Sequence, residues 1–222
     1  MAKVIIGVLR GSNYKGRIDS SDLAMAEDKL KGRWCICQNE SGSDLAKIIC
    51  LCEDKDCPSN EERPLGKLVR LIEDGDLAKI KEVKQFEAGA DKECRELIEK
   101  HDLRMKLIRT ILSFDERRLT FYFASEDRVD FRLLVKDLVG RFHKMIRLQQ
   151  IGPRDHAKLL SGVGICGREL CCAKFLSSSA KITKDAAMRQ GMESLSSDKI
   201  SGACGKLMCC LRFELNDYED KK

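Results

Sequence analysis

The chain has 222 residues, of which 43% are hydrophobic and 35% are charged, a composition typical of a globular protein with a solvated surface. Its apolar runs stay below the ~18 residues that a membrane span needs, so we expect no membrane insertion. The 41 basic and 36 acidic residues are interspersed and leave a net charge of +5, which argues against a basic nucleic-acid-binding tail. The start, MAKVIIGVLRGSNYKG, turns polar too soon for a secretory signal, and we therefore expect a cytoplasmic protein.

Residues 1–60 predict a small antiparallel β module. The short apolar runs VIIGVL, RWCIC and KIICLC are separated by polar stretches such as QNESGSD. Their β-branched residues and their spacing are typical of strands. The stretch that follows, EDKDCPSNEERP, holds two of the three prolines and many charges, which indicates a surface loop or linker.

Residues 65–160 predict an α/β sandwich in which helices cover one face of a sheet. LGKLVRLI is typical of a strand, and residues 76–103 carry apolar side chains near a 3.6-residue repeat, including Leu77 and Val83. Two alternating apolar runs then flank FDERR, which is the pattern of a β-hairpin. An amphipathic helix follows in RVDFRLLVKDLVGRFHKMI, and RLQQIG returns as a strand. With the first module, this order predicts an α+β fold.

Cysteines are the most informative part of the composition, because there are twelve of them. In a reducing cytoplasm, clustered cysteines more often bind metal or carry out redox chemistry than form disulfides. Residues 161–215 hold six of the twelve, in the two phrases CGRELCC and CGKLMCC, which are displaced by 38 residues. The candidate ligands are Cys166, Cys171, Cys172, Cys204, Cys209 and Cys210.

Both copies place a glycine directly after the first cysteine and a basic residue after that glycine. Gly167 and Gly205 permit a tight turn with unusual dihedral angles. Backbone amides in such a turn can hydrogen-bond to thiolate sulfurs, and the basic side chain can offset their negative charge. We therefore predict a metal-binding double loop at the end of the chain, packed with the sandwich.

The residues alone leave several occupants of this double loop open. A structural zinc ion needs four ligands, usually from paired C-x-x-C spacings, and the present spacing fits that pattern loosely. An iron-sulfur cluster takes four cysteines from a wider range of spacings. Direct thiol chemistry is less favoured because no C-x-x-C is present, and some cysteines can simply be small buried apolar residues. The functional alternatives are a zinc-stabilised nucleic-acid-associated adaptor and a thiol oxidoreductase.

Several ordered motifs between about Leu65 and Glu214 resemble one bacterial family. The motifs are FDERRLTFYF, VDFRLLVKDL, QIGPRDHAKLL, the two cysteine phrases and SLSSDKISG. They closely resemble the RicT (YaaT) family, whose members carry the polymerase-suppressor-protein (PSP) C-terminal conserved region. A weaker similarity extends into the N-terminal strands.

This resemblance implies a non-enzymatic regulatory subunit. Members of the family assemble with the small helical proteins RicA and RicF into a complex that carries [4Fe-4S] clusters. The complex associates with the endoribonuclease RNase Y, influences mRNA maturation and promotes sporulation. The resemblance therefore implies that all six cysteines of the double loop are linked to a cluster, and that any association with RNA is indirect.

Five further cysteines lie in the N-terminal module, outside the resemblance: Cys35, Cys37, Cys50, Cys52 and Cys57. A hairpin turn at residues 43–44 would place Cys35 opposite Cys52 and Cys37 opposite Cys50, which would create a second metal site. The polar residues NESG instead favour a turn near residues 40–41, which breaks this square of thiols. Core packing is therefore favoured over a metal site here, and Cys94, inside a predicted helix, is expected to be structural.

Overall fold

The computed structural model describes residues 3–10, 15–19, 30–39, 42–53, 65–174, 182–192 and 196–219. The chain divides into two compact units, residues 1–151 and residues 152–222. Strands and helices both contribute, so the predicted α+β class is confirmed. None of the helices in the described part of the chain combines the length and the apolar character needed to cross a bilayer.

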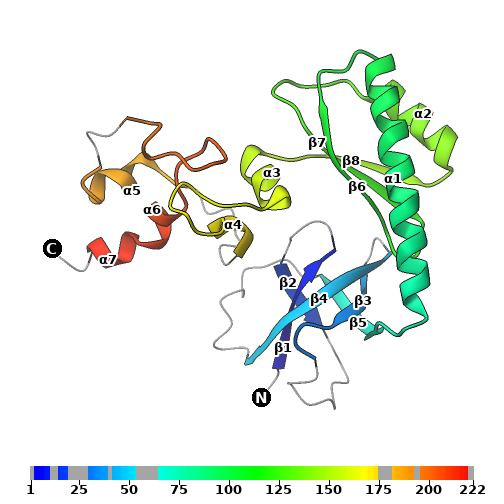
Figure 1. The fold of residues 1–222 in the computed structure, drawn as a ribbon, viewed down its shortest axis with the longest axis horizontal. Coiled ribbons are helices and arrows are strands. Elements are labelled where there is room, and N and C mark those ends of the chain that lie inside the picture. Colours follow the sequence, from blue (N-terminus) through cyan, green and yellow to red (C-terminus); the bar gives the residue numbers. More distant parts are fainter. Residues whose placement is uncertain are drawn as a thin grey trace. The chain divides into compact units, whose positions relative to one another are not determined.

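A closed five-stranded barrel forms the N-terminal part of the first unit (Figure 1). Its strands are β1 (Lys3–Leu9), β2 (Lys15–Asp19), β3 (Trp34–Asn39), β4 (Gly42–Glu53) and β5 (Gly66–Leu71). They follow the order β1-β2-β5-β3-β4, and all neighbours are antiparallel except β2 and β5. Ile18, Leu30 and Ile48 lie in its core with 1% exposure or less, so the barrel encloses its own apolar interior.

Strand β5 lies in the segment 65–160 that the sequence groups with the helices, yet it pairs inside the barrel. It is parallel to β2 and antiparallel to β3. Placing β5 between these two strands closes the sheet, and a closed sheet leaves no unpaired edge strand. The strand itself is confirmed where it was expected, but its partners come from distant parts of the sequence.

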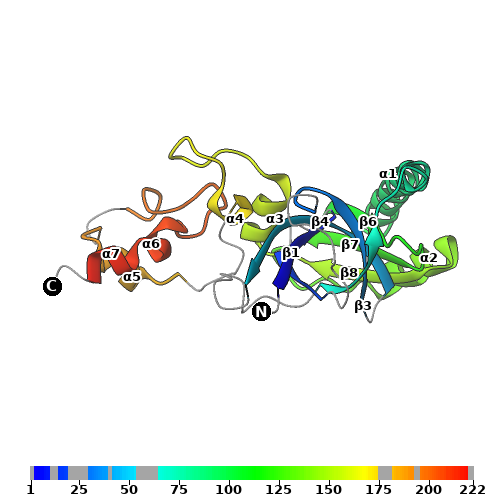
Figure 2. The ribbon, with the colours of Figure 1, turned by 90° about the horizontal axis from the view of Figure 1, so that it is seen from below.

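The second part of the first unit is a two-layer α/β arrangement. Its elements are α1 (Asp76–Lys100), β6 (Lys106–Leu112), β7 (Arg118–Ala124), α2 (Arg132–Phe142) and β8 (Met145–Gln150). The sheet order is β6-β7-β8, with β6 and β7 forming the antiparallel hairpin and β8 parallel to β7. Figure 2, in which α1 is seen nearly end-on, shows both helices beside this sheet.

Alternation along the strands explains why the helices cover one face. Leu119 and Phe121 of β7 are both completely buried and belong to the same apolar cluster as Leu134 and Leu138 of α2. The expected helix stripe is only partly confirmed, because Val83 is buried whereas Leu77, at the start of α1, is 51% exposed. The buried face of α1 instead continues through its C-terminal half.

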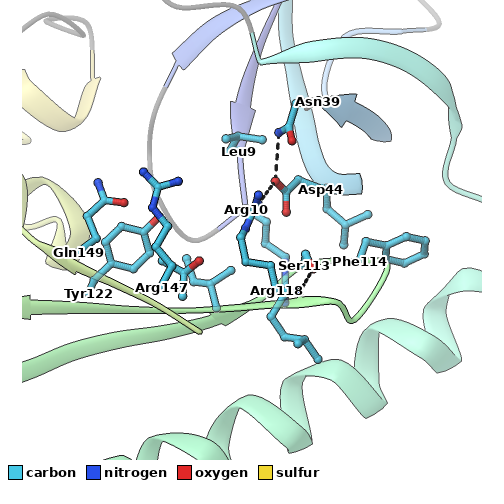
Figure 3. A pocket seen from close by; sticks show the side chains of 14 residues that line it. Leu9, Arg10, Asn39, Asp44, Ser113, Phe114, Arg118, Tyr122, Arg147 and Gln149 are labelled. Carbon is cyan, nitrogen blue, oxygen red and sulfur yellow. Dashed lines mark hydrogen bonds and ion pairs between the residues drawn. The ribbon is translucent and has the colours of Figure 1, made fainter. Parts of the chain in front are cut away.

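The barrel and the sheet are joined by polar contacts around a cavity of about 160 Å³ (Figure 3). Arg118 on β7 donates from Nη2 to Oδ2 of Asp44 on β4 at 2.7 Å, and both side chains are largely shielded from solvent. The Phe114 amide donates to the Ser43 carbonyl at 2.8 Å. Arg10, which follows β1, pairs with a glutamate on α1. These contacts tie the two parts of the unit together.

The second unit contains short helices around the two cysteine phrases. They are α3 (Pro153–Leu160), α4 (Cys171–Lys174), α5 (Lys184–Arg189), α6 (Cys210–Phe213) and α7 (Leu215–Glu219). A small apolar cluster that includes Ala186, Ile200 and Leu211 holds α5 against the C-terminal helices. Helix α3, which the sequence places at the end of the sandwich, belongs to this unit and packs on α4.

Candidate metal centre

The two cysteine phrases form the same loop twice. Each loop is closed by an isolated antiparallel bridge, Val163 with Glu169 in the first copy and Ser201 with Leu207 in the second. Both partners of the second bridge are displaced by the 38 residues that separate the sequence phrases. The sequence repeat is therefore a structural repeat as well.

Corresponding backbone hydrogen bonds stabilise the two loops. The Gly164 amide donates to the Arg168 carbonyl at 2.8 Å, and the Gly202 amide donates to the Lys206 carbonyl at the same distance. Three further bonds from an amide to a carbonyl recur with the same displacement. In the first loop they run from Gly167 to Gly164, from Leu170 to Gly162 and from Ala173 to Leu170. In the second loop they run from Gly205 to Gly202, from Met208 to Ile200 and from Leu211 to Met208. In Figure 1 the first loop runs in yellow between α3 and α4, and the second runs in orange before α6.

The glycine after the first cysteine of each phrase adopts the conformation that its type permits. Gly167 has φ of 78° and Gly205 has φ of 71°, both in the left-handed region that disfavours other residues. A Cβ atom at either position would meet no other atom within 4 Å. The backbone dihedral, rather than close packing, therefore makes glycine suitable here, and the predicted tight turn is confirmed.

All six cysteines of the double loop line one cavity of about 80 Å³. The rest of its lining is mostly apolar and includes Ile165, Leu170 and Leu207, while Glu169 is its charged residue. Cys171 lies at the start of α4, and Cys210 lies at the start of α6. The structure thus brings the predicted candidates together, although whether each one binds metal stays a prediction.

Thiols of the two loops influence one another electrostatically. Burial raises the pKa of the Cys172 thiol, and the negative charge of Cys204 raises it further. Burial also raises the pKa of Cys209, and charges on Cys171, Cys172 and Cys204 act in the same direction. Cys166 differs from the others because it is exposed. The interacting set therefore draws on both copies of the loop.

The donor set of the double loop consists of thiols that line a cavity. Within the described residues, no three His, Cys, Asp or Glu side chains are arranged to hold one metal ion. A structural zinc ion needs four ligands that converge on one point, about 2.3 Å from each sulfur. An iron-sulfur cluster has several irons to share among its thiolates, so cysteines around a cavity match its donor chemistry.

Two cations on α3, Arg154 and Lys158, were not identified from the sequence. The Arg154 Nη2 donates to the Leu207 carbonyl in the second loop at 3.1 Å. Lys158 is only 6% exposed. Their separation of four residues places them on one helix face, directly before the first loop, and this spacing is a signal that sequence reasoning could have used.

Cys35 and Cys37 on β3 belong to the core of the barrel. Cys35 and Cys37 are completely buried in the barrel core, with their sulfurs 3.7 Å apart. Because Cys35 pairs with Ala46 and Cys37 pairs with Asp44, the square of thiols is wrong. Asn39 pairs with Gly42, which confirms the register expected for a turn at residues 40–41, although those two residues lie outside the described ones. Core packing is confirmed for this pair.

Cys50 and Cys52, two of the remaining N-terminal candidates, lie on β4. The backbone of Cys50 pairs with that of Ile6, and the backbone of Cys52 pairs with that of Val4, so this part of β4 is hydrogen-bonded to β1. Cys57 lies outside the described residues. Cys94 is completely buried in α1, as expected for a structural residue, and burial raises its pKa to about 12.

Comparisons with known proteins agree with the motifs. Residues 66–151 match the PSP1 C-terminal conserved region, and residues 181–222 match the PSP1-like protein, third domain. The chain is 45% identical over 159 residues to the stage 0 sporulation protein YaaT of Bacillus subtilis (strain 168), which covers 72% of this chain and 58% of that protein. No solved structure matches. The chain therefore belongs to the family of YaaT-like proteins that carry the PSP1 C-terminal conserved region.

Proposed function

We propose that this chain is a non-enzymatic regulatory subunit that binds or shares a [4Fe-4S] cluster through the double loop. The observation that carries this proposal is the cavity lined by all six cysteines of the two loops. The candidate ligands are Cys166, Cys171, Cys172, Cys204, Cys209 and Cys210. When bound, the cluster would supply an electron-accepting centre that can be lost on exposure to oxygen.

The walls of the cavity support a structural or sensing role. Apart from the thiols and Glu169, they consist of apolar side chains and small residues. Such walls shield a soft inorganic group from water, and solvent exposure is one of the properties that set the potential of a cluster. A polar substrate would find few side-chain donors or acceptors to orient it, which favours a platform over a catalytic site.

The number of thiols supports sharing with partners. One cluster uses four cysteines, whereas six line the cavity, and Cys166 is exposed. Val163 and Ile165, in the same loop, are 64% and 67% exposed, which leaves apolar surface beside that thiol. We propose that RicA- and RicF-like helical proteins dock here and complete or cover the cluster.

In the cell, we propose a cytoplasmic complex that regulates RNase Y-dependent mRNA maturation and developmental signalling. The name of the Bacillus relative, a stage 0 sporulation protein, supports the developmental part of this proposal. The chain spans 58% of the length of that relative. Association with RNA would be indirect, through the endoribonuclease.

The first experiment determines what the double loop binds. The chain is purified without oxygen, alone and with RicA- and RicF-like proteins, and iron, acid-labile sulfide and zinc are measured together. We expect iron with sulfide and a broad absorption band near ~400 nm that bleaches in air. Zinc without sulfide would replace this proposal with the zinc-stabilised adaptor.

Serine substitutions then assign the ligands. Cys172→Ser and Cys209→Ser should lose iron and sulfide, because both thiols lie in the interacting set of the two loops. Cys94→Ala is the matched control, since that thiol is buried in the other unit and should retain full loading. Loss of thiol turnover in the loop variants without loss of partner binding would instead favour a thiol oxidoreductase.

A further inference from the structure

We propose that Arg154 and Lys158 on α3 are positioning residues that neutralise the cysteine thiolates of the double loop and set the reduction potential of its cluster. This inference rests on the proposed cluster and concerns residues that are not cysteines. Both cations stand on α3, which packs directly on α4, and Ala157 between them lines the cysteine cavity. Residues 154, 157 and 158 are spaced so that they share one face of α3.

Arg154 donates one hydrogen bond to the second loop, and its Nε provides a second donor that is not used in the described part of the chain. Its Nη2 donates to the Leu207 carbonyl at 3.1 Å, and Leu207 itself lines the cavity. Its Nε is buried and has no hydrogen-bond partner within the described residues. A buried donor without an acceptor destabilises the folded state. A thiolate or a cluster sulfide in the cavity is an acceptor that would remove this cost.

Lys158 provides the second charge, one helical turn further along α3. Only 6% of the residue is exposed, so its side chain lies within the second unit rather than in solvent. Like Arg154, it lies on the face of α3 that carries Ala157, a lining residue of the cysteine cavity.

The positive charges of Arg154 and Lys158 would offset the negative charge of the thiolates. Four thiolates bring four negative charges into a cavity whose walls are mostly apolar, and unpaired charge in such surroundings is costly. Adding an electron makes the group more negative still. Nearby fixed cations therefore stabilise the reduced form more than the oxidised form, and they raise the reduction potential.

The test removes one charge at a time and measures the midpoint potential of the anaerobic protein, with iron and sulfide content determined in the same samples. Arg154→Gln and Lys158→Gln remove a charge, whereas Arg154→Lys and Lys158→Arg retain it. Arg189→Gln on α5 is the control, because that exposed cation pairs with Asp185. We expect each Gln variant to shift the ratio of oxidised to reduced cluster about tenfold toward the oxidised form, which is ~59 mV for one electron.

Each outcome is decisive. Lower potentials in the two Gln variants, with Arg154→Lys, Lys158→Arg and Arg189→Gln near the wild type, would support the inference. Wild-type potentials in both Gln variants with full iron loading would overturn the inference and leave the cluster intact. A shift in Arg154→Lys as large as in Arg154→Gln would overturn the charge account. A wild-type chain without iron and sulfide would refute both proposals, and if Arg154→Gln does not fold, Lys158→Gln decides alone.

Discussion

Replacing Gly167 by alanine should loosen the first cysteine loop by about 1–2 kcal/mol, because an L-residue at a left-handed dihedral pays that cost. The magnitude follows from the backbone alone: φ is 78°, and the added Cβ would meet no atom within 4 Å, so no clash adds to the dihedral term. Gly205→Ala should have the same effect on the second loop, where φ is 71°.

Hydrogen-deuterium exchange with peptide resolution measures this change where it occurs. A loss of 1–2 kcal/mol corresponds to about 5–30-fold faster exchange in residues 162–170, whose amides close the loop. Gly140→Ala is the matched control, since this glycine lies inside α2 and its Cβ would also meet open space. That change should stabilise α2 by about 0.5–1 kcal/mol.

The opposite signs of two identical substitutions make this test stringent. If Gly167→Ala left exchange in its loop at the wild-type rate, the left-handed turn would not be what stabilises the double loop. The same conclusion would follow if Gly167→Ala protected its loop as Gly140→Ala is expected to protect α2.

Three further predictions concern the first unit and the free thiols. Arg118→Ala or Asp44→Ala should each lower the free energy of unfolding in urea by about 1–3 kcal/mol, because the shielded hydrogen bond between the two charges is lost. Strict additivity in the double variant would contradict this explanation. A guanidinium hydrogen bond lowers the pKa of Asp76 to about 2, below its unfolded value of 3.8. The stabilisation by ionised Asp76 is therefore present above pH ~4 and is lost as the pH falls toward ~2. Asp76→Asn should reduce the loss of thermal stability over that range, and an unchanged pH dependence would contradict the role of this ion pair. Iodoacetamide should label exposed Cys166 in metal-free protein well before the buried Cys94, and rapid labelling of Cys94 would contradict its burial.

Elements with a strong local signal were predictable. The apolar period of residues 76–103 predicts α1, which spans Asp76–Lys100, and the alternating runs around FDERR predict the hairpin of β6 and β7. The reason is that helices and tight hairpins are stabilised by contacts between residues close in sequence. The same reasoning placed the turn of the β3 and β4 hairpin, because polar residues at 40–41 fit a connection.

Long-range pairings were not predictable in this way. The sequence of β5 alone predicts a strand, but its six residues do not indicate that it pairs with β2 and β3 to close a barrel. The thiol square, which the polar turn residues already disfavoured, is excluded by the observed register. A change of register moves every cross-strand neighbour together, and the register follows from the turn and from the barrel core.

For the double loop, the sequence by itself determined the local chemistry: two copies of three cysteines, each with a glycine able to take a left-handed turn. These features are local because backbone hydrogen bonds within about ten residues close each loop. Only the tertiary structure decided that both loops face one cavity and that Arg154 on α3 donates a hydrogen bond to the second loop. The physical reason is that this arrangement depends on the packing of α3, α4 and the small C-terminal apolar core, whose contacts join residues far apart in the chain.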